Sequence, residues 1–200
     1  MKRIGVLASG RGSNLGAILE ATRSGILRDL CKIHVVASDR EGSGALDLAR
    51  AQGVPARALP VAGRPRRVWD QALVELLEPY ALDYLVLAGF MRILSEVVIL
   101  RYPGRIVNIH PADTRLHQGL HGYAWAFEQR LPSTKVTVHL VDAGLDTGPV
   151  LLQREVDLRG ADSLAEVERR GLAVEHAAYS EALRDLLTGQ GAPSPPTKAG

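Results

Sequence analysis

The 200-residue sequence is poor in the residues that mark special classes of protein, with one cysteine, two tryptophans, five tyrosines and two phenylalanines. The single cysteine, Cys31, excludes a framework of intrachain disulfides and fits a reducing cytosol. So few aromatic side chains leave no stacking platform for single-stranded nucleic acid, and a net charge of +2 argues against a dedicated nucleic-acid-binding protein. No hydrophobic run approaches the ~20 residues of a membrane-spanning helix. The rest of the composition, 46% hydrophobic and 23% charged, is typical of a soluble globular protein.

The two ends of the sequence differ from its middle. The start MKRIGVLASGRGS has an apolar stretch only from residue 4 to 8, which is too short for a secretory signal peptide, so we expect a cytoplasmic protein. The segment TGQGAPSPPTKAG (188–200) is rich in proline and glycine and is expected to be a flexible tail. Because no repeat or linker interrupts residues 1–187, we expect them to form a single domain.

Apolar, β-branched segments alternate with segments of helical periodicity in the first half of the chain. Strands are expected at 3–9, 32–39, 55–60, 82–90 and 105–110, and helices at 13–26, 44–53, 65–80 and 93–102. This alternation implies right-handed crossovers and a parallel sheet. Residues 135–141 and 149–158 instead alternate as half-exposed, antiparallel strands do, and 163–187 is one long helix capped by Asp162 or Ser163. The expected fold is therefore α/β: a Rossmann-like, mostly parallel twisted sheet flanked by helices, with antiparallel strands in the C-terminal half.

A glycine-rich turn, LASGRGSNLG, connects the first expected strand to the first helix. Such a turn lies at the carboxyl end of a parallel strand, where ligands bind, and a helix N-terminus favours an anion. Gly10 and Gly12 match a dinucleotide fingerprint and Asp39 could hold a ribose, but Leu15 stands where the third glycine should be. Two other interpretations remain open: a phosphate site or a plain turn with a helix cap. The residues that would bind the phosphate are Gly12, Ser13 and Asn14.

The strand RIVNIH ends in two polar residues, Asn108 and His110, which lie two apart and therefore point to the same face. An amide beside an imidazole can polarise a carbonyl and stabilise the oxyanion that forms on nucleophilic attack. The loop VDAGLDTGP carries Asp142 and Asp146, and a carboxylate near His110 would raise its pKa and hold it protonated. The alternative is that these side chains are structural or simply solvated.

Metal and covalent chemistry are both disfavoured. His117 and His121 have the spacing of a helical zinc pair, but Gly119 between them disfavours a helix and Gln118 replaces the usual glutamate base. There is no G-x-S-x-G nucleophile motif, and Cys31 has no evident base nearby in sequence. The other histidines, His34, His139 and His176, are expected to be structural, although His139 belongs to the strand region of the site.

Four segments together resemble the phosphoribosylglycinamide formyltransferases of purine biosynthesis, collinearly from about residue 3 to 187. These segments are GSNL (12–15), LAGFMRIL (87–94), NIHP (108–111) and LDTGP (145–149). NIHP with LDTGP is typical of folate-dependent formyltransferases in general, whereas GSNL and LAGFMRIL indicate this branch. The resemblance implies direct transfer of a formyl group from 10-formyltetrahydrofolate to the amine of glycinamide ribonucleotide. It implies small-molecule substrates, no metal, no nucleic-acid or membrane partner, and leaves room for a homodimer.

The resemblance also implies roles for the matching residues. Those expected to hold the ribonucleotide are Gly12, Ser13, Asn14 and Glu175. Those expected to bind the folate are Arg66, Met91, Arg92, Ile93, Leu94 and Asn108, with Arg64 and Arg67 as alternatives to Arg66. Asn108 would hydrogen-bond the formyl oxygen, His110 would be its protonated partner, and Asp146 would keep His110 protonated.

The loop after NIHP departs from the family. Relatives usually read HPSLLPxFxG, whereas this chain reads HPADTRLHQG, with Ala112, Asp113, Thr114 and Arg115 at the variant positions. Lys135 also stands where a glycine is common. These departures put loop packing and substrate fit in question.

Three other functions are weighed against the transferase. A formyltetrahydrofolate deformylase shares the GSNL turn, and a non-catalytic ligand-binding relative would explain the altered loop. A nicotinamide-dependent oxidoreductase would use the incomplete dinucleotide fingerprint and Asp39.

Overall fold

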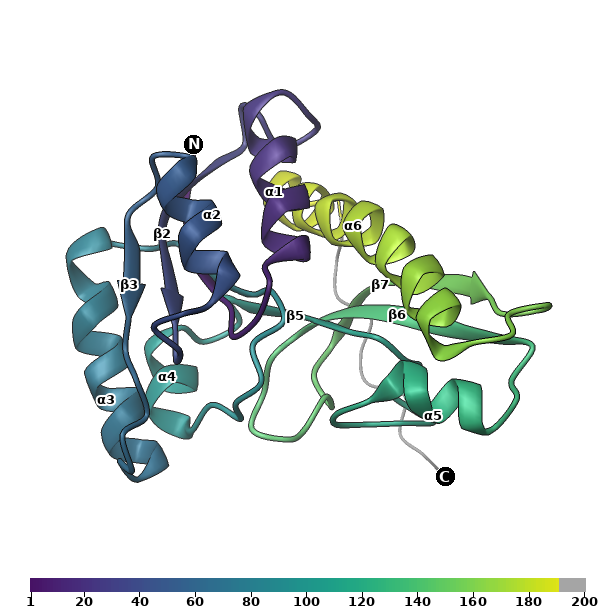
Figure 1. Cartoon of the computed structure of the whole chain (residues 1–200). Coiled ribbons are helices and arrows are strands. Elements are labelled where there is room, and N and C mark those ends of the chain that lie inside the picture. The colour runs from purple at the N-terminus through teal and green to yellow at the C-terminus, as the bar shows by residue number, and fades with distance from the viewer. Residues whose placement is uncertain (191–200) are drawn as a thin grey trace.

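Within residues 1–190, seven strands form one sheet, and helices pack on both of its faces (Figure 1). The computed structural model describes residues 1–190. Most of the tail predicted for 188–200, from residue 191 onward, therefore lies outside the described residues. The strands are β1 (Lys2–Leu7), β2 (Cys31–Ser38), β3 (Ala56–Ala58), β4 (Tyr84–Leu87), β5 (Ile106–His110), β6 (Ser133–Leu140) and β7 (Val150–Asp157). Their order in the sheet is β3-β2-β1-β4-β5-β6-β7. β1 to β5 are parallel, whereas β6 and β7 are antiparallel additions, which confirms the predicted fold class.

The helices form a layer on each face of the sheet. They are α1 (Ser13–Arg23), α2 (Gly44–Ala51), α3 (Arg66–Leu77), α4 (Glu96–Arg101), α5 (Gly122–Glu128) and α6 (Leu164–Thr188), with a 3₁₀ turn at Glu78–Tyr80. The apolar residues of α1, α2 and α6 share one core with the sheet, and those of α3 and α4 share the other. α5 packs against α6, near the antiparallel end of the sheet.

Both faces of the central strands are buried, because successive side chains of a strand point to opposite faces. On β1, Val6 lies in the core under α1 and α6, and Leu7 lies in the core under α3. On β4, Val86 and Leu87 divide in the same way. Parallel strands covered on both faces read as continuous apolar runs, which is why these segments could be recognised in the sequence.

The chain leaves the sheet earlier after β4 than predicted. β4 ends at Leu87 instead of residue 90, and residues 89–94 line the cavity described below. The helix that follows begins at Glu96 rather than 93, since the polypeptide is extended at Ser95.

Two helices in the C-terminal half test the prediction differently. α5 has no counterpart in it, because seven residues are too few to show a helical period. α6 begins as predicted: the Ser163 hydroxyl accepts a hydrogen bond from the Glu166 backbone N–H at 3.4 Å, so Ser163 rather than Asp162 is the N-cap.

The carboxyl ends of β1, β4 and β5 meet at one edge of the sheet, where ligands bind in open α/β sheets. The Met91 backbone N–H, after β4, donates to the Ser9 hydroxyl, after β1, at 3.0 Å. Tyr179 of α6 reaches between β4 and β5, with its hydroxyl 2.8 Å from the Leu87 carbonyl and 3.0 Å from the Val107 carbonyl. These contacts fix the strand ends relative to each other.

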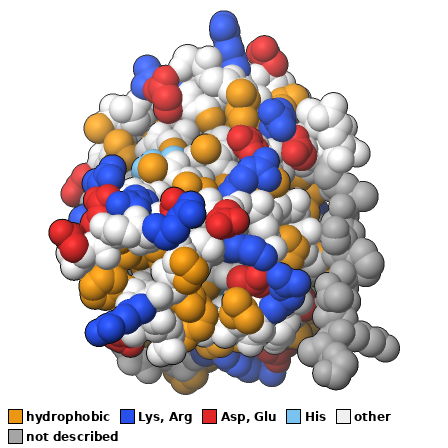
Figure 2. All heavy atoms as spheres, turned by 90° about the vertical axis from the view of Figure 1, so that its right-hand side faces the viewer, with side chains coloured by type: hydrophobic (Ala, Val, Ile, Leu, Met, Phe, Trp, Pro, Cys, Tyr) orange, Lys and Arg blue, Asp and Glu red, His pale blue; other side chains and the backbone are white. Residues whose placement is uncertain are grey.

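The surface carries charges of both signs side by side, as the face in Figure 2 shows. On β7 and α6, Arg154 pairs with Glu181 and Arg169 with Glu166. Within residues 1–190, no helix combines the length and the apolar character that crossing a membrane requires.

Candidate functional site

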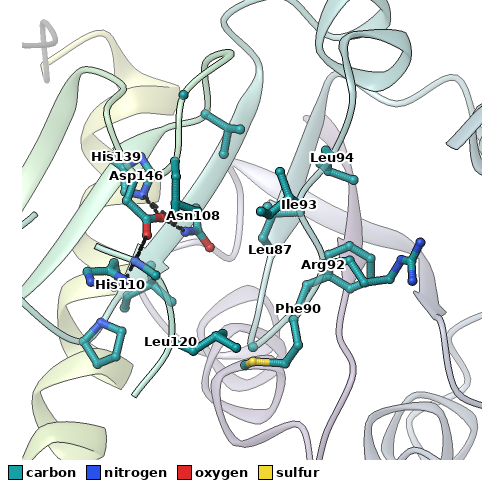
Figure 3. A pocket seen from close by; sticks show the side chains of 18 of the residues that line it. Leu87, Phe90, Arg92, Ile93, Leu94, Asn108, His110, Leu120, His139 and Asp146 are labelled. Atoms are coloured by element: carbon teal, nitrogen blue, oxygen red, sulfur yellow. Dashed lines mark hydrogen bonds and ion pairs between the residues drawn. The ribbon is translucent and has the colours of Figure 1, made fainter. Parts of the chain in front are cut away.

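A cavity of about 390 Å³ lies at the carboxyl ends of β4 and β5 (Figure 3). One wall is apolar and follows β4, with Leu87, Phe90, Ile93 and Leu94. The opposite wall is polar, with Asn108, His110, His139 and Asp146. Such a cavity suits a flat, mostly apolar ligand whose reactive group meets a few convergent polar side chains.

Asp146 joins the two polar residues at the end of β5. Its Oδ2 lies 3.4 Å from His110 Nδ1, and its Oδ1 accepts a hydrogen bond from Asn108 Nδ2 at 3.3 Å. Asp142, the other carboxylate of this loop, accepts instead from Thr147 within the loop, at 2.7 Å. The structure therefore brings Asp146, and not Asp142, beside His110.

Asp146 is held in place by its own backbone and by two neighbours. Its φ of +53° lies in the left-handed region, which is uncommon for a residue with a side chain. Residues in this conformation are often found at functional sites. The Gly119 backbone N–H donates to Oδ2 at 2.9 Å, and His139 Nε2 lies 3.4 Å from Oδ1. Burial raises the pKa of Asp146, but the hydrogen bonds from His139 and Gly119 outweigh it and leave the pKa below its ordinary value. Asp146 is thus ionised at neutral pH.

The protonation of His110 differs from the prediction. Burial lowers the pKa of His110, and this outweighs the opposite effects of Asp146 and of the His117 carbonyl. His139 and His117 also face the ring and lower the pKa further. The expectation that Asp146 holds His110 protonated is therefore wrong for this state of the protein. Nevertheless, His110 Nε2 lies 3.0 Å from the His117 carbonyl, so both ring nitrogens face oxygen atoms that would stabilise an imidazolium.

His139 belongs to this cluster, although the sequence predicts a structural role for it. It lies directly across from Asn108 in the antiparallel pairing of β5 with β6. Its Nε2 is 3.2 Å from Asn108 Nδ2, and its Nδ1 is 2.9 Å from the Leu140 carbonyl. The strict alternation of KVTVHLV indicated a strand that includes His139. Only the register between β5 and β6 shows that this strand places His139 beside Asn108.

The side-chain amide of Asn108 is turned toward Asp146 and His139. Its Nδ2 contacts both of them, while its carbonyl oxygen points away from Asp146 toward the apolar wall (Figure 3). An amide in this orientation presents an acceptor to the cavity. Donation to a ligand oxygen requires the amide to turn over.

A second polar cluster lies beside the glycine-rich turn after β1. Asn14 Nδ2 donates to Glu175 Oε2 at 2.6 Å, and the Tyr123 hydroxyl donates to Glu175 Oε1 at 2.6 Å. Asn14 and Glu175 are both buried and are 161 residues apart in sequence. Among the described residues, Asn14 Oδ1 has no hydrogen-bond partner. The structure thus brings together two of the residues predicted to bind the ribonucleotide.

Gly12 and Ser13 stand where that turn becomes α1. Gly12 has a φ of +86°, and a Cβ on it would lie 2.9 Å from the Ala45 backbone Cα, so only glycine fits. Ser13 is the first residue of α1 and is exposed. The backbone amides at this helix start are free to approach an anion.

Tyr123 is a functional candidate that sequence reasoning missed. It lies on α5 and reaches Glu175 across the backbone of α6 at Gly171, where a Cβ would collide with the tyrosine ring. Burial and the neighbouring Glu175 raise the pKa of Tyr123 far above its ordinary value, so it remains a hydrogen-bond donor. A glycine in the middle of a long helix was the one signal of this contact in the sequence.

The residues predicted to bind folate divide into two groups. Those that line the cavity are Met91, Arg92, Ile93, Leu94 and Asn108. Arg92 stacks its guanidinium on the ring of Trp69, 4.6 Å from the ring centroid. Arg66 is exposed at the start of α3 and does not line the cavity, and neither do Arg64 and Arg67. Arg67 forms an ion pair with Glu96.

His117 contacts a backbone carbonyl and an aromatic ring. His117 Nε2 lies 3.0 Å from the Leu120 carbonyl, and its ring stacks on Trp125 at 4.9 Å between centroids. His121 has a φ of +67° and precedes α5. Within residues 1–190 there is no group of three or more His, Cys, Asp or Glu side chains arranged to hold a metal ion.

Comparison with known proteins assigns this geometry to a family. The chain matches the formyl transferase family model over residues 2–183. It is 37% identical to the phosphoribosylglycinamide formyltransferase of Escherichia coli K12, over 87% of this chain and 82% of that protein. It resembles the crystal structure of glycinamide ribonucleotide transformylase 1 from Symbiobacterium toebii with a TM-score of 0.92 and 40% identity, over 98% of this chain and 92% of that one.

Other relatives are longer than this chain. The trifunctional purine biosynthetic protein adenosine-3 of Drosophila pseudoobscura pseudoobscura is 35% identical over 94% of this chain, which spans 14% of that protein's length. A formyltetrahydrofolate deformylase from Pseudomonas syringae has a TM-score of 0.88 over 98% of this chain and 64% of its own, but at 24% identity it shows the fold alone. The family match includes every strand of the sheet. Together with the relatives in sequence and in structure, it agrees with the resemblance of the four segments. This chain belongs to the formyl transferase family, in the branch of the phosphoribosylglycinamide formyltransferases.

Proposed function

We propose that this protein transfers the formyl group of 10-formyltetrahydrofolate to the amine of glycinamide ribonucleotide, in de novo purine biosynthesis. The observation that carries the proposal is the cluster of Asn108, His110 and Asp146 on the polar wall of an otherwise apolar cavity. The folate would lie against the apolar wall formed by Leu87, Phe90, Ile93 and Leu94, with its formyl group toward this cluster. Both substrates are small molecules, and neither metal nor nucleic acid has a part in the proposed reaction.

The second cluster supports the binding of the ribonucleotide. The N-terminus of α1, with Gly12 and Ser13, would hold the phosphate through backbone amides and a hydroxyl. The Glu175 carboxylate would meet the ribose, held by Asn14 and Tyr123 on the protein side. The amine would then lie between this cluster and His110.

The proposed reaction is a direct acyl transfer. The amine nitrogen attacks the formyl carbon, and the electron pair of the carbonyl moves to its oxygen, giving a tetrahedral intermediate. The electron pair then re-forms the carbonyl while the bond from carbon to N10 of the folate breaks. N10 takes up a proton, and the new amide nitrogen loses one, with Asp146 or a water molecule on Asp146 as the carrier.

Asn108 and His110 would stabilise the oxyanion. Asn108 would turn its amide so that Nδ2 donates to the formyl oxygen instead of to Asp146. The negative charge that grows on that oxygen would raise the pKa of His110 against the effect of burial, so that the ring takes up a proton from solvent. Its two N–H groups would then donate to Asp146 and to the His117 carbonyl. The ionised Asp146 thus balances a charge on His110 that exists only during the reaction.

The test is absorbance-monitored conversion of 10-formyltetrahydrofolate by the purified protein, with and without glycinamide ribonucleotide. Conversion that requires the ribonucleotide, with formyl-ribonucleotide formed in equal amount, is the expected result. Conversion without it, with release of formate, would identify a deformylase. No conversion in either case, with both ligands bound, would leave a non-catalytic relative. A His34→Gln variant, at a half-buried histidine that does not line the cavity, serves as the control for His110→Gln.

A further inference from the structure

The loop that departs from the family contains an ion cluster, centred on the buried residue Asp113. Asp113 is 4% exposed, and its carboxylate accepts two hydrogen bonds from the exposed Arg115 guanidinium, at 3.0 and 2.8 Å. Lys135 Nζ on β6 donates to it at 2.8 Å, and Gln153 on β7 lies 3.5 Å away. The hydrogen bonds from Arg115 lower the pKa of Asp113 far below its ordinary value, so the carboxylate is charged throughout the neutral range.

This cluster connects two departures that lie far apart in sequence. Asp113 and Arg115 belong to the altered loop, and Lys135, the unusual residue on β6, reaches the same carboxylate. β6 and β7 hold the loop start through a further contact, since the Thr137 hydroxyl donates to the Ala112 carbonyl at 2.7 Å. The substitutions therefore form one interaction that attaches the loop to the antiparallel end of the sheet.

The backbone leads from this cluster directly to His110. The Asp113 carbonyl accepts hydrogen bonds from the backbone N–H groups of Leu116 and His117, at 2.9 and 3.0 Å, and so closes one turn of helix. At the end of that turn the His117 carbonyl lies 3.0 Å from His110 Nε2. Two residues on, the Gly119 N–H donates to Asp146 at 2.9 Å. The loop thus supplies one backbone contact to each member of the His110–Asp146 pair.

We propose that Asp113, anchored by Lys135 and Arg115, is a positioning residue: it fixes the turn at 113–117 so that the loop backbone holds His110 and Asp146 in their reactive arrangement. This inference rests on the proposed function, in which His110 stabilises the oxyanion and Asp146 balances the charge on His110. Such a cluster is weak support for a stabilising role, because desolvation of the Asp113 carboxylate and solvent screening of the exposed Arg115 offset much of the attraction. Specifying one arrangement of a loop is the better-attested use of such a cluster.

The chain contains a matched control for this cluster. Asp157 and Arg159 form the same local motif, with the guanidinium donating at 2.9 and 2.9 Å and the Arg159 N–H donating to the same carboxylate at 3.0 Å. The corresponding N–H of Arg115 donates to Asp113 at 3.1 Å. The Asp157 pair is exposed at the end of β7 and does not line the cavity, so Asp157→Asn removes the motif without touching the loop.

The experiment compares Asp113→Asn with Asp157→Asn in the full-length protein. We measure kcat and KM for both substrates, and the pKa of His110 by NMR titration of the imidazole, assigned with His110→Gln. For Asp113→Asn we expect kcat to fall on the order of 10- to 100-fold, with KM values within about threefold of the unaltered protein. We also expect the His110 pKa to fall, because the His117 carbonyl that favours the imidazolium moves away. Asp157→Asn should change neither quantity.

Two results would overturn the inference: a folded Asp113→Asn variant with unchanged kcat and His110 pKa, or a loss of kcat that Asp157→Asn reproduces. If Asp113→Asn does not fold, Lys135→Met replaces it under the same criteria. This variant removes the contact between Lys135 and Asp113 and leaves the Arg115 contact in place. The NMR titration needs no activity, so it tests the inference even if the unaltered protein fails to transfer a formyl group, an outcome that would refute the proposed function instead.

Discussion

Replacing Gly171 by alanine probes the contact between α5 and α6, and two effects of opposite sign decide its outcome. Alanine is favoured over glycine in a helix interior by about 1 kcal/mol, so the change would stabilise an isolated helix. In the folded protein the new Cβ would collide with the Tyr123 ring, which is buried and rigid. Forcing a methyl group into a packed site costs about 1 to 3 kcal/mol.

The collision also has an electrostatic cost. If Tyr123 moves aside, the Glu175 carboxylate loses the hydrogen bond that it accepts at 2.6 Å while it remains buried. A hydrogen bond to a charged group contributes about 1.5 to 3 kcal/mol. The net expectation is that Gly171→Ala lowers the free energy of unfolding by roughly 2 to 5 kcal/mol, because these two costs exceed the gain in helix propensity.

Urea denaturation at equilibrium, followed by circular dichroism, measures this effect. Gly16→Ala in α1 is the matched control, because a Cβ there would make only an ordinary contact, 3.6 Å from Leu48. We expect that control to be neutral or to stabilise by up to about 1 kcal/mol. In a Tyr123→Ala background, where the ring is absent, Gly171→Ala should also become neutral or stabilising. If Gly171→Ala stabilises the unaltered protein, or destabilises equally in both backgrounds, the account of this contact is wrong.

Three further predictions concern the site itself. Asn108→Ala should lower kcat on the order of 10²- to 10³-fold with the fold intact, because one oxyanion donor is lost. Steady-state kinetics measure the change in kcat, and circular dichroism checks the fold. A loss of kcat under about threefold would exclude Asn108 from the reaction. Gly12→Ala should raise KM for the ribonucleotide with little change in KM for the folate, because its backbone would be strained and would press on Ala45. The depressed pKa of His110 means that the unfolded chain binds a proton before the folded chain does. The free energy of unfolding should therefore fall as the pH drops from about 7.5 toward 5.5, and His110→Gln should flatten this slope in urea denaturation; an unchanged slope would contradict the burial argument.

The sequence by itself determined the features that depend on local periodicity. The alternation of buried strands with helices predicted the parallel sheet, and the strict alternation of the last two strands predicted their antiparallel pairing. The two-residue period of a strand was enough to put Asn108 and His110 on one face. The start of α6 could be predicted for the same reason, with either Asp162 or Ser163 as its cap, and the structure shows that the cap is Ser163.

Only the tertiary structure decided which distant residues meet and what their contact does to them. His139 enters the site because of the register between β5 and β6, and Tyr123 reaches Glu175 because a glycine opens the backbone of another helix. The pairing of Asp113 with Lys135 joins two departures that look unrelated along the chain. Even the resting protonation of His110 was decided there, because burial, which no local pattern encodes, outweighs the carboxylate beside it.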